Sequence, residues 1–385
     1  MIKRGAVKAG LFVLFLIFLE GVSSSVYAAY SLLFPHEAHR TLSGPSVQYD
    51  RELGWVPVPG FYDSSYYAPG VPLKINSQGF RADQDYRKAV PSGKIRVVCS
   101  GDSQGFGDGV GNDHTWCQLL ASLDPRIQPV NMSETGYGLD QMYLWYRRNS
   151  SVLDHDIHLL AVIADDFRRM KYPVMWGVGK PLLEVQQGEL TEINIPVPPP
   201  SGTRRWLSLQ PNPLRTFRSV AVLADLATAL AGGKTMSENG PSREVAALSA
   251  KIFQSLQAID RRKGSTLVVV FLPTRDTDYA PGGTSDLWRG FLRHELGALG
   301  IPFVDVVNDD YHQLPVTMKD GMFIWPGSVH FFAEAPGHFN DEGHDYLARS
   351  IYAQLLAIPE VAGKLHRSTT RRVQLDATSS VAESR

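Results

Sequence analysis

The chain has 385 residues and a formal net charge of −1 at pH 7, so its overall charge does not indicate nucleic acid as a partner. Hydrophobic residues make up 43% of the sequence and charged residues 20%, which allows one large globular domain with additions or two domains. The sequence contains no CxxC, HExxH or P-loop motif, and HEAH at 36–39 has the wrong spacing for a zinc helix. We therefore predict neither a metal site nor a cofactor.

The first 34 residues predict an export signal or a membrane anchor. The basic start MIKR precedes an unbroken apolar run at 9–19, which Glu20 ends. A run this short suits a signal peptide cleaved before Ala29, and the alternative is an uncleaved anchor over 9–34 that contacts the membrane. Both alternatives place the rest of the chain outside the cytoplasm, as a periplasmic, membrane-anchored or secreted protein.

Residues 35–92 are rich in Pro, Gly, Tyr and Ser and predict short strands and turns, an N-terminal extension packed on the main domain. The main domain is predicted over 93–360, where buried strands alternate with helices. The strands are expected at 94–100, 127–133, 157–165, 265–273 and 301–307, and the helices at 115–123, 139–153, 241–262, 284–300 and 341–357.

Residues 171–262 interrupt the alternation and are predicted to form an insertion or lid. A hairpin and a proline-rich loop are expected over 171–216, followed by helices at 216–232 and 241–262. The polar segment 366–385 predicts a disordered tail.

Strand–helix alternation predicts an α/β protein with a parallel sheet and helices on both faces, a three-layer α/β/α, flavodoxin-like arrangement. In such sheets ligands bind at the carboxyl ends of the strands. Ser103 directly follows the first strand of the main domain, so we expect it at that edge.

The two cysteines, Cys99 and Cys117, are too few for a disulfide scaffold. Cys99 lies at a predicted strand end and Cys117 near the following helix. Two small buried hydrophobic residues are the favoured interpretation. A disulfide between them is the alternative, which the sequence cannot establish.

Ser103 stands in CSGDSQGFGDGV, a Gly-Asp-Ser turn followed by a glycine-rich loop. GDSQG matches the G-x-S-x-G elbow of α/β-hydrolases, but that elbow normally follows several strands and an upstream oxyanion loop, which are missing here. A serine nucleophile needs a base within hydrogen-bonding reach and preorganised donors for an oxyanion. Glycines let backbone N–H groups approach closely.

Three segments resemble the sequence blocks of the SGNH (GDSL-type) hydrolase family. CSGDSQGFGDGV resembles the first block, NMSETGYG at 131–138 the second and GHFNDEGH at 337–344 the last. The resemblance covers about 94–357. KINSQGFR at 74–81 is similar to the extension of an exported or membrane-tethered bacterial branch. The resemblance implies the SGNH hydrolase fold and ester chemistry through an acyl-serine intermediate.

The resemblance also implies roles for individual residues. Ser103 matches the nucleophile, and its backbone N–H and that of Gly136 match oxyanion donors. His338 matches the base. His344 is the alternative base, because Asp341 and His344 form an Asp-x-x-His sequence of their own.

Asn340 is predicted to be a helix N-cap, which places His338 in the preceding loop, where it can reach the strand ends. Asp102 and Asn131 are expected to order the serine turn and the second block through hydrogen bonds.

Asp165 occupies the position where the family has an oxyanion-binding Asn. An ionised carboxylate accepts hydrogen bonds and does not donate them, so Asp165 is a doubtful third donor. The alternative is that Asp165 caps the turn or binds Arg168 or Arg169.

The acid of the triad also departs from the family pattern. Ala335 stands three residues before His338, where the family has Asp, and Glu334 is the nearest upstream carboxylate. Glu334 is therefore the candidate third member, and a serine–histidine dyad aided by a backbone carbonyl is the alternative.

We expect an exported serine esterase or O-acyltransferase that acts on ester bonds. Acylated polysaccharide of the envelope or the medium is the expected substrate class. The alternative is a catalytically degenerate module that binds a glycan or an assembly partner.

Overall fold

The computed structural model describes residues 8, 10–22, 24, 44–175, 178–199, 240–274, 284–307, 317–319, 322–324, 330–332 and 337–365. The chain divides into two units, one of residues 1–41, 176–178 and 200–235 and one of the remainder. In the first unit, residues 10–22 are helical. Within the described ranges no helix has both the length and the apolar character needed to cross a membrane. The predictions for 216–232 and 366–385 lie outside the described residues.

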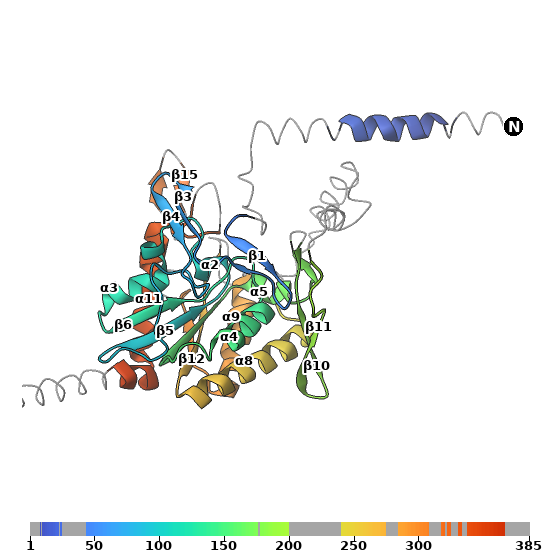
Figure 1. Ribbon diagram of the computed structural model, residues 1–385. Helices are drawn as coiled ribbons and strands as arrows, with labels where there is room; N and C mark the ends of the chain where they lie inside the picture. The colour runs from blue at the N-terminus through green and yellow to red at the C-terminus, as the bar shows by residue number, and fades with distance from the viewer. Residues whose placement is uncertain are drawn as a thin grey trace, which may run out of the picture. The chain divides into compact units, whose positions relative to one another are not determined.

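Five parallel strands form the central sheet of the second unit, in the spatial order β13-β12-β7-β5-β6 (Figure 1). They are β5 (Ile95–Ser100), β6 (Ile127–Asn131), β7 (Ile157–Val162), β12 (Thr266–Phe271) and β13 (Phe303–Asp305). This is the 2-1-3-4-5 order of a flavodoxin-like sheet, so the predicted fold class is confirmed. Every residue of β5, β7 and β12 is buried, as expected for parallel strands covered on both faces.

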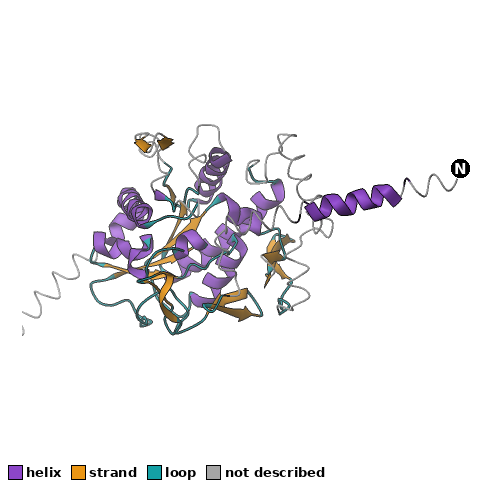
Figure 2. Cartoon of the chain, turned by 90° about the horizontal axis from the view of Figure 1, so that it is seen from above, coloured by secondary structure: helices purple, strands orange, loops and turns teal. Residues whose placement is uncertain are grey.

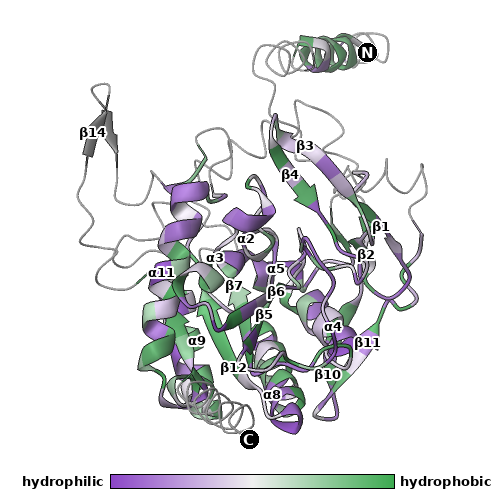
Figure 3. Cartoon of the chain, turned by 60° about the vertical axis from the view of Figure 1, so that its left-hand side comes forward, coloured by the Kyte–Doolittle hydropathy of each residue, from purple (hydrophilic) through white to green (hydrophobic). Residues whose placement is uncertain are grey.

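Helices cover both faces of the sheet (Figure 2). The helices α3 (Trp116–Leu123) and α11 (Asp341–Ala357) pack together and enclose an apolar core with the sheet. The other three, α4 (Leu139–Asn149), α8 (Arg243–Lys263) and α9 (Thr284–Leu299), contact one another in turn. In Figure 3 the inner strands β7 and β12 carry the hydrophobic colour.

The predicted insertion extends too far toward the C-terminus. The helix α8 packs on α4 and β12 and provides the crossover between β7 and β12. Its apolar residues recur at helical spacing, and Val245, Ile252, Phe253 and Leu256 are buried. A helix with such a face belongs to the core layer and not to a lid.

The described part of the insertion begins after α5 (Ala164–Arg169) and consists of short strands. They are β8 (Val174–Met175), β9 (Val178–Gly179), β10 (Leu182–Gln186) and β11 (Glu189–Ile193). The strands β10 and β11 form the predicted antiparallel hairpin. A further pair, β14 (Thr317–Lys319) and β15 (Met322–Ile324), lies near the C-terminal end of the domain sequence.

The N-terminal extension forms two antiparallel pairs, as its turn-rich composition predicts. They are β1 (Val47–Asp50) with β2 (Gly54–Pro57) and β3 (Tyr62–Ala68) with β4 (Val71–Lys74). The extension then reaches the sheet edge, where the Arg81 N–H donates to the Asn131 carbonyl of β6 at 3.1 Å.

Cys99 and Cys117 form a disulfide, so the favoured interpretation as two free buried thiols is wrong. The end of β5 packs against the start of α3, which brings the two Cα atoms to 6.3 Å, within the range a disulfide spans. Both residues are fully buried in the core between the sheet, α3 and α11.

Candidate active site

Ser103 is the first residue of α2 (Ser103–Phe106), a single helical turn that follows β5 at the carboxyl edge of the sheet. Asp102 caps this turn, because its Oδ1 accepts from the Gln104 N–H at 2.9 Å. Asn131 donates from its side-chain amide to the carbonyls of Gly105 and Phe106 at the end of the turn. The predicted ordering roles of Asp102 and Asn131 are therefore confirmed.

Glycine is required at position 105 by close packing. A Cβ on Gly105 would lie 2.4 Å from the Ser133 Oγ, in the loop after β6. The serine turn and the second block are therefore packed directly against each other.

The structure brings Ser103 and His338 together. The Ser103 Oγ lies 3.1 Å from the His338 Nε2, although 235 positions separate the two residues. Asn340 caps α11, accepting from the Gly343 N–H at 2.9 Å, so His338 lies in the loop before the helix. The His338 carbonyl accepts from the Phe332 N–H at 3.0 Å, which ties this loop to a neighbouring segment.

His344 and Asp341 are placed elsewhere. The His344 ring is buried, and its Nδ1 accepts from the Trp116 N–H at the start of α3. Burial lowers the pKa of His344 to about 3, so the ring is neutral near pH 7. Asp341 is exposed and lies 3.0 Å from the His114 Nδ1. This alternative pair does not contact Ser103.

Glu334 lies outside the described residues. Within those residues no carboxylate forms an ion pair with His338. The structure thus shows a serine–histidine pair whose third member, if any, is not among the described carboxylates.

The residues expected to donate to an oxyanion, Ser103 and Gly136, lie on two loops that are bonded to each other. Ser103 is the first residue of α2, where N–H groups have no intrahelical acceptor. Gly136 has a φ of +79°, in the region that favours glycine. The Glu134 N–H donates to the Gly101 carbonyl at 3.1 Å, which holds the Gly136 loop against the serine turn.

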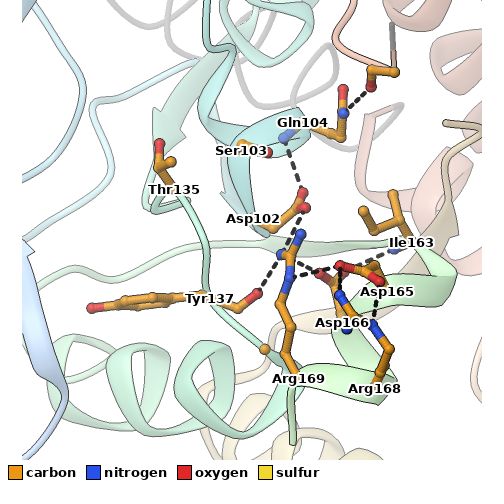
Figure 4. Close-up of polar contacts among 12 residues, drawn as sticks. Asp102, Ser103, Gln104, Thr135, Tyr137, Ile163, Asp165, Asp166, Arg168 and Arg169 are labelled. Carbon is orange, nitrogen blue, oxygen red and sulfur yellow. Dashed lines mark hydrogen bonds and ion pairs between the residues drawn. The ribbon is translucent and has the colours of Figure 1, made fainter. Parts of the chain in front are cut away.

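Asp165 does not supply an oxyanion donor in this structure. Its carboxylate accepts from Arg168 at 2.7 Å and from Arg169 at 3.2 Å (Figure 4). Burial alone would raise the pKa of Asp165, but the two guanidinium groups hold it below its usual range. An ionised, ion-paired carboxylate is an acceptor only, so the alternative of pairing with the arginines is the one observed.

Arg169 links the Asp165 region to the serine turn. Its Nη1 donates to Asp102 at 3.1 Å, to Asp166 at 2.9 Å and to the Tyr137 carbonyl at 2.9 Å (Figure 4). Arg169, Asp102 and Asp166 are all buried. Burial, together with the negative charge of Asp102, raises the pKa of Asp166. This cluster holds the turn that carries Ser103.

A second serine–histidine–aspartate relay lies inside the domain. The Ser100 Oγ is 2.6 Å from the His158 Nε2, and the His158 Nδ1 is 3.0 Å from Asp260. Tyr146 stacks on the His158 ring and donates to Asp260. Ser100, His158 and Asp260 are at most 1% exposed. Without access for a substrate this relay is a buried polar network.

Sequence reasoning missed two residues that organise the site. The buried guanidinium of Arg81 donates to the carbonyls of Phe106 and Gly107 at 2.7 Å, so the extension holds the glycine-rich loop. Gln104 donates from its side-chain amide to the Gly337 carbonyl. Neither residue is marked by periodicity or spacing in the sequence. The one sequence signal for Gln104 is its position next to Ser103.

In the described part of the chain no cluster of His, Cys, Asp or Glu could hold a metal ion.

No protein-family model and no curated protein matches the chain. Solved structures with some likeness include a member of the lipolytic protein G-D-S-L family from Veillonella parvula DSM 2008, 11% identical, with a TM-score of 0.34 over 67% of this chain and 97% of that one. An acetylxylan esterase from Geobacillus stearothermophilus is 12% identical, with a TM-score of 0.38 over 71% and 95%. An alpha/beta hydrolase enzyme from the metagenome of Lake Arreo, Spain, is 13% identical, with a TM-score of 0.39 over 71% and 98%. At such TM-scores these likenesses carry no argument about function. The function is argued from the residues of this chain.

Proposed function

We propose that the protein is a serine esterase of the SGNH type. The observation that carries the proposal is the 3.1 Å separation of the Ser103 Oγ and the His338 Nε2 at the carboxyl edge of a parallel sheet. A hydroxyl within hydrogen-bonding reach of an imidazole is the arrangement from which serine nucleophiles act. The first and the last of the three resembling sequence blocks supply these two residues.

The reaction follows from these groups. The Ser103 oxygen attacks the ester carbonyl carbon while His338 accepts the hydroxyl proton. The N–H groups of Ser103 and Gly136 stabilise the oxyanion of the tetrahedral intermediate. The intermediate collapses with cleavage of the ester C–O bond, and the alcohol leaves with the proton from His338. Water, activated by His338, then attacks the acyl-serine, releases the acid and restores the Ser103 hydroxyl.

The experiment that tests this proposal is hydrolysis of p-nitrophenyl acetate and longer acyl esters by the full chain. Ser103→Ala should abolish the reaction, and His338→Ala should slow it by at least about a hundredfold, the usual contribution of a general base. Wild-type protein that neither turns over these esters nor reacts with a fluorophosphonate would contradict the proposal.

We further propose export and an acylated polysaccharide as the substrate. The basic and apolar N-terminus favours export, and the Cys99–Cys117 disulfide fits an oxidising compartment. Fractionation of a bacterial host tests the location, and recovery of the protein in the cytoplasm would contradict export.

Release of acetate from an O-acetylated polysaccharide, compared with the same polymer after deacetylation, tests the substrate. Transfer of the acyl group to an added sugar would identify an O-acyltransferase.

One observation favours a second function, a degenerate module that binds a glycan or an assembly partner. The carboxylate of Asp165 stands where the resembling family has an amide donor, and it forms ion pairs with Arg168 and Arg169. Binding of a polysaccharide by wild type and by Ser103→Ala alike, without turnover by either, would favour this function.

A further inference from the structure

The side chain of Gln104 joins the two loops that carry Ser103 and His338. The side-chain amide of Gln104 donates to the carbonyl of Gly337, 233 positions away in the sequence. Gln104 directly follows Ser103, and Gly337 directly precedes His338. The bond therefore connects the turn of Ser103 to the peptide unit that links Gly337 to His338.

Gln104 is itself held in place. Its N–H donates to the Asp102 carboxylate at 2.9 Å, and its carbonyl accepts from the Trp116 Nε1 at 3.1 Å. The residue lies within α2 and is only 4% exposed. The amide thus extends from a backbone that is bonded on both sides.

The loop of the base is constrained at the matching point. Gly337 has a φ of +104°, and a Cβ there would lie 2.9 Å from the Thr274 carbonyl oxygen, so a larger residue would have to shift the loop. The next carbonyl, that of His338, accepts from the Phe332 N–H at 3.0 Å. Two consecutive carbonyls of the loop are therefore hydrogen-bonded, one of them by Gln104.

We propose that Gln104 is a positioning residue for the base and sets the distance between the His338 ring and the Ser103 hydroxyl. A catalytic imidazole needs a contact that orients it, and the described residues include no carboxylate that pairs with His338. A buried carbonyl left without its donor is costly, so loss of the amide should move the Gly337 peptide and the ring beyond it. The kinetic consequence rests on the proposed esterase function, whereas the position of the ring does not.

The test compares Gln104→Met with Gln257→Met in the full chain. Methionine keeps the length and burial of glutamine and removes the amide donor. Gln257 is a matched control, because its amide also donates to a backbone carbonyl, that of Leu299 at 3.1 Å. Gln257 lies beside Thr266, the first residue of β12, and thus at the edge of the sheet opposite to Ser103.

Gln104→Met should lower kcat for p-nitrophenyl acetate by roughly tenfold to a hundredfold, the effect of a small misplacement of a reacting group. KM should change by less than about twofold, because the proposed role of the amide is to position the ring and not to bind the substrate. The NMR signal of the His338 ring C–H, assigned by its loss in His338→Ala, should shift in Gln104→Met and not in Gln257→Met.

A kcat for Gln104→Met within about twofold of that for Gln257→Met would overturn the inference, whatever the ring signal does. If wild type hydrolyses no ester, the proposed function fails, and the inference about Gln104 is then tested by the His338 ring signal alone. An unchanged ring signal in Gln104→Met would overturn the inference. Should Gln104→Met not fold, Gln104→Leu replaces it, because leucine also has no donor for the Gly337 carbonyl and should give the same losses.

Discussion

The Ser100 Oγ lies 2.6 Å from the His158 Nε2, a shorter separation than the 3.1 Å between Ser103 and His338. Ser100 and Ser103 are three residues apart, and the relay of Ser100 also has its aspartate in place. The distances alone would therefore favour Ser100. Position and exposure favour Ser103 in the proposed function, because Ser103 begins a helical turn beyond the strand end and is 7% exposed, whereas Ser100 lies within β5 and is 1% exposed.

A fluorophosphonate should label Ser103 and not Ser100. Ser103→Ala should therefore abolish labelling, while Ser100→Ala retains it at a rate within about threefold of wild type, since buried polar contacts away from the substrate have small kinetic effects. Intact-mass spectrometry with peptide mapping measures the adduct. An adduct on Ser100 would mean that the relay opens in solution and that the site assignment is wrong.

The buried relay should contribute to stability. Asp260 accepts from both His158 and Tyr146, and replacing it by Asn removes the charge and sets an NH₂ group against one of these donors. We expect Asp260→Asn to lower the free energy of unfolding by about 2–4 kcal/mol, against about 1 kcal/mol for Ser100→Ala. Urea unfolding measures both. Equal effects of the two variants would show that Asp260 does not anchor the network.

Arg168 and Arg169 are adjacent and share Asp165, but they should differ in importance. Arg169 is 7% exposed and is the partner of buried Asp102 and Asp166, so Arg169→Met should cost about 3–5 kcal/mol of stability. Arg168 is 36% exposed, so Arg168→Met should cost less than about 1 kcal/mol. Thermal and urea unfolding of the two variants measures these losses. A larger loss of stability in Arg168→Met than in Arg169→Met would contradict the prediction.

His344 should make the fold sensitive to acid. Its pKa is about 6.5 when unfolded and about 3 in the folded protein, because burial disfavours the charged ring. The unfolded chain therefore takes up the proton first, and stability falls as the pH drops below 6.5. From pH 7 to pH 5 this group alone should remove about 2 kcal/mol.

The control for this pH effect is His344→Asn, whose side-chain oxygen can accept from the Trp116 N–H in place of Nδ1 and does not titrate. Urea unfolding at pH 7 and pH 5 should show a smaller loss of stability in the variant than in wild type. The same loss in both proteins would assign the acid sensitivity to other groups.

The disulfide should stabilise the domain by closing a loop of 18 residues between Cys99 and Cys117. A loop of this length corresponds to about 3 kcal/mol of chain entropy. The double variant Cys99→Ala/Cys117→Ala should unfold at correspondingly lower urea concentration, and thiol titration of unfolded wild type should find no free thiol. Two free thiols in protein purified without reductant would contradict the bond.

Much of the architecture could be predicted because parallel strands buried on both faces have a distinct sequence pattern. The apolar runs ending at Ser100 and Phe271, and the helix that Asn340 caps, lie where hydrophobic periodicity and cap chemistry place them. The sequence places α8 in an insertion, because the long segment between β7 and α8 gives no sign that the helix packs on the same sheet.

The order of strands and helices, the serine turn and the histidine loop could be predicted, because they depend on local pattern and on motif spacing. Which side chains meet is set by the tertiary fold. In the folded chain Ser103 contacts His338, His344 is buried, and two arginines form ion pairs with Asp165. Cys99 is bonded to Cys117, and Gln104 donates to Gly337. These contacts join positions that local sequence patterns do not relate, and folding of the sheet and its covering helices sets the distances between them.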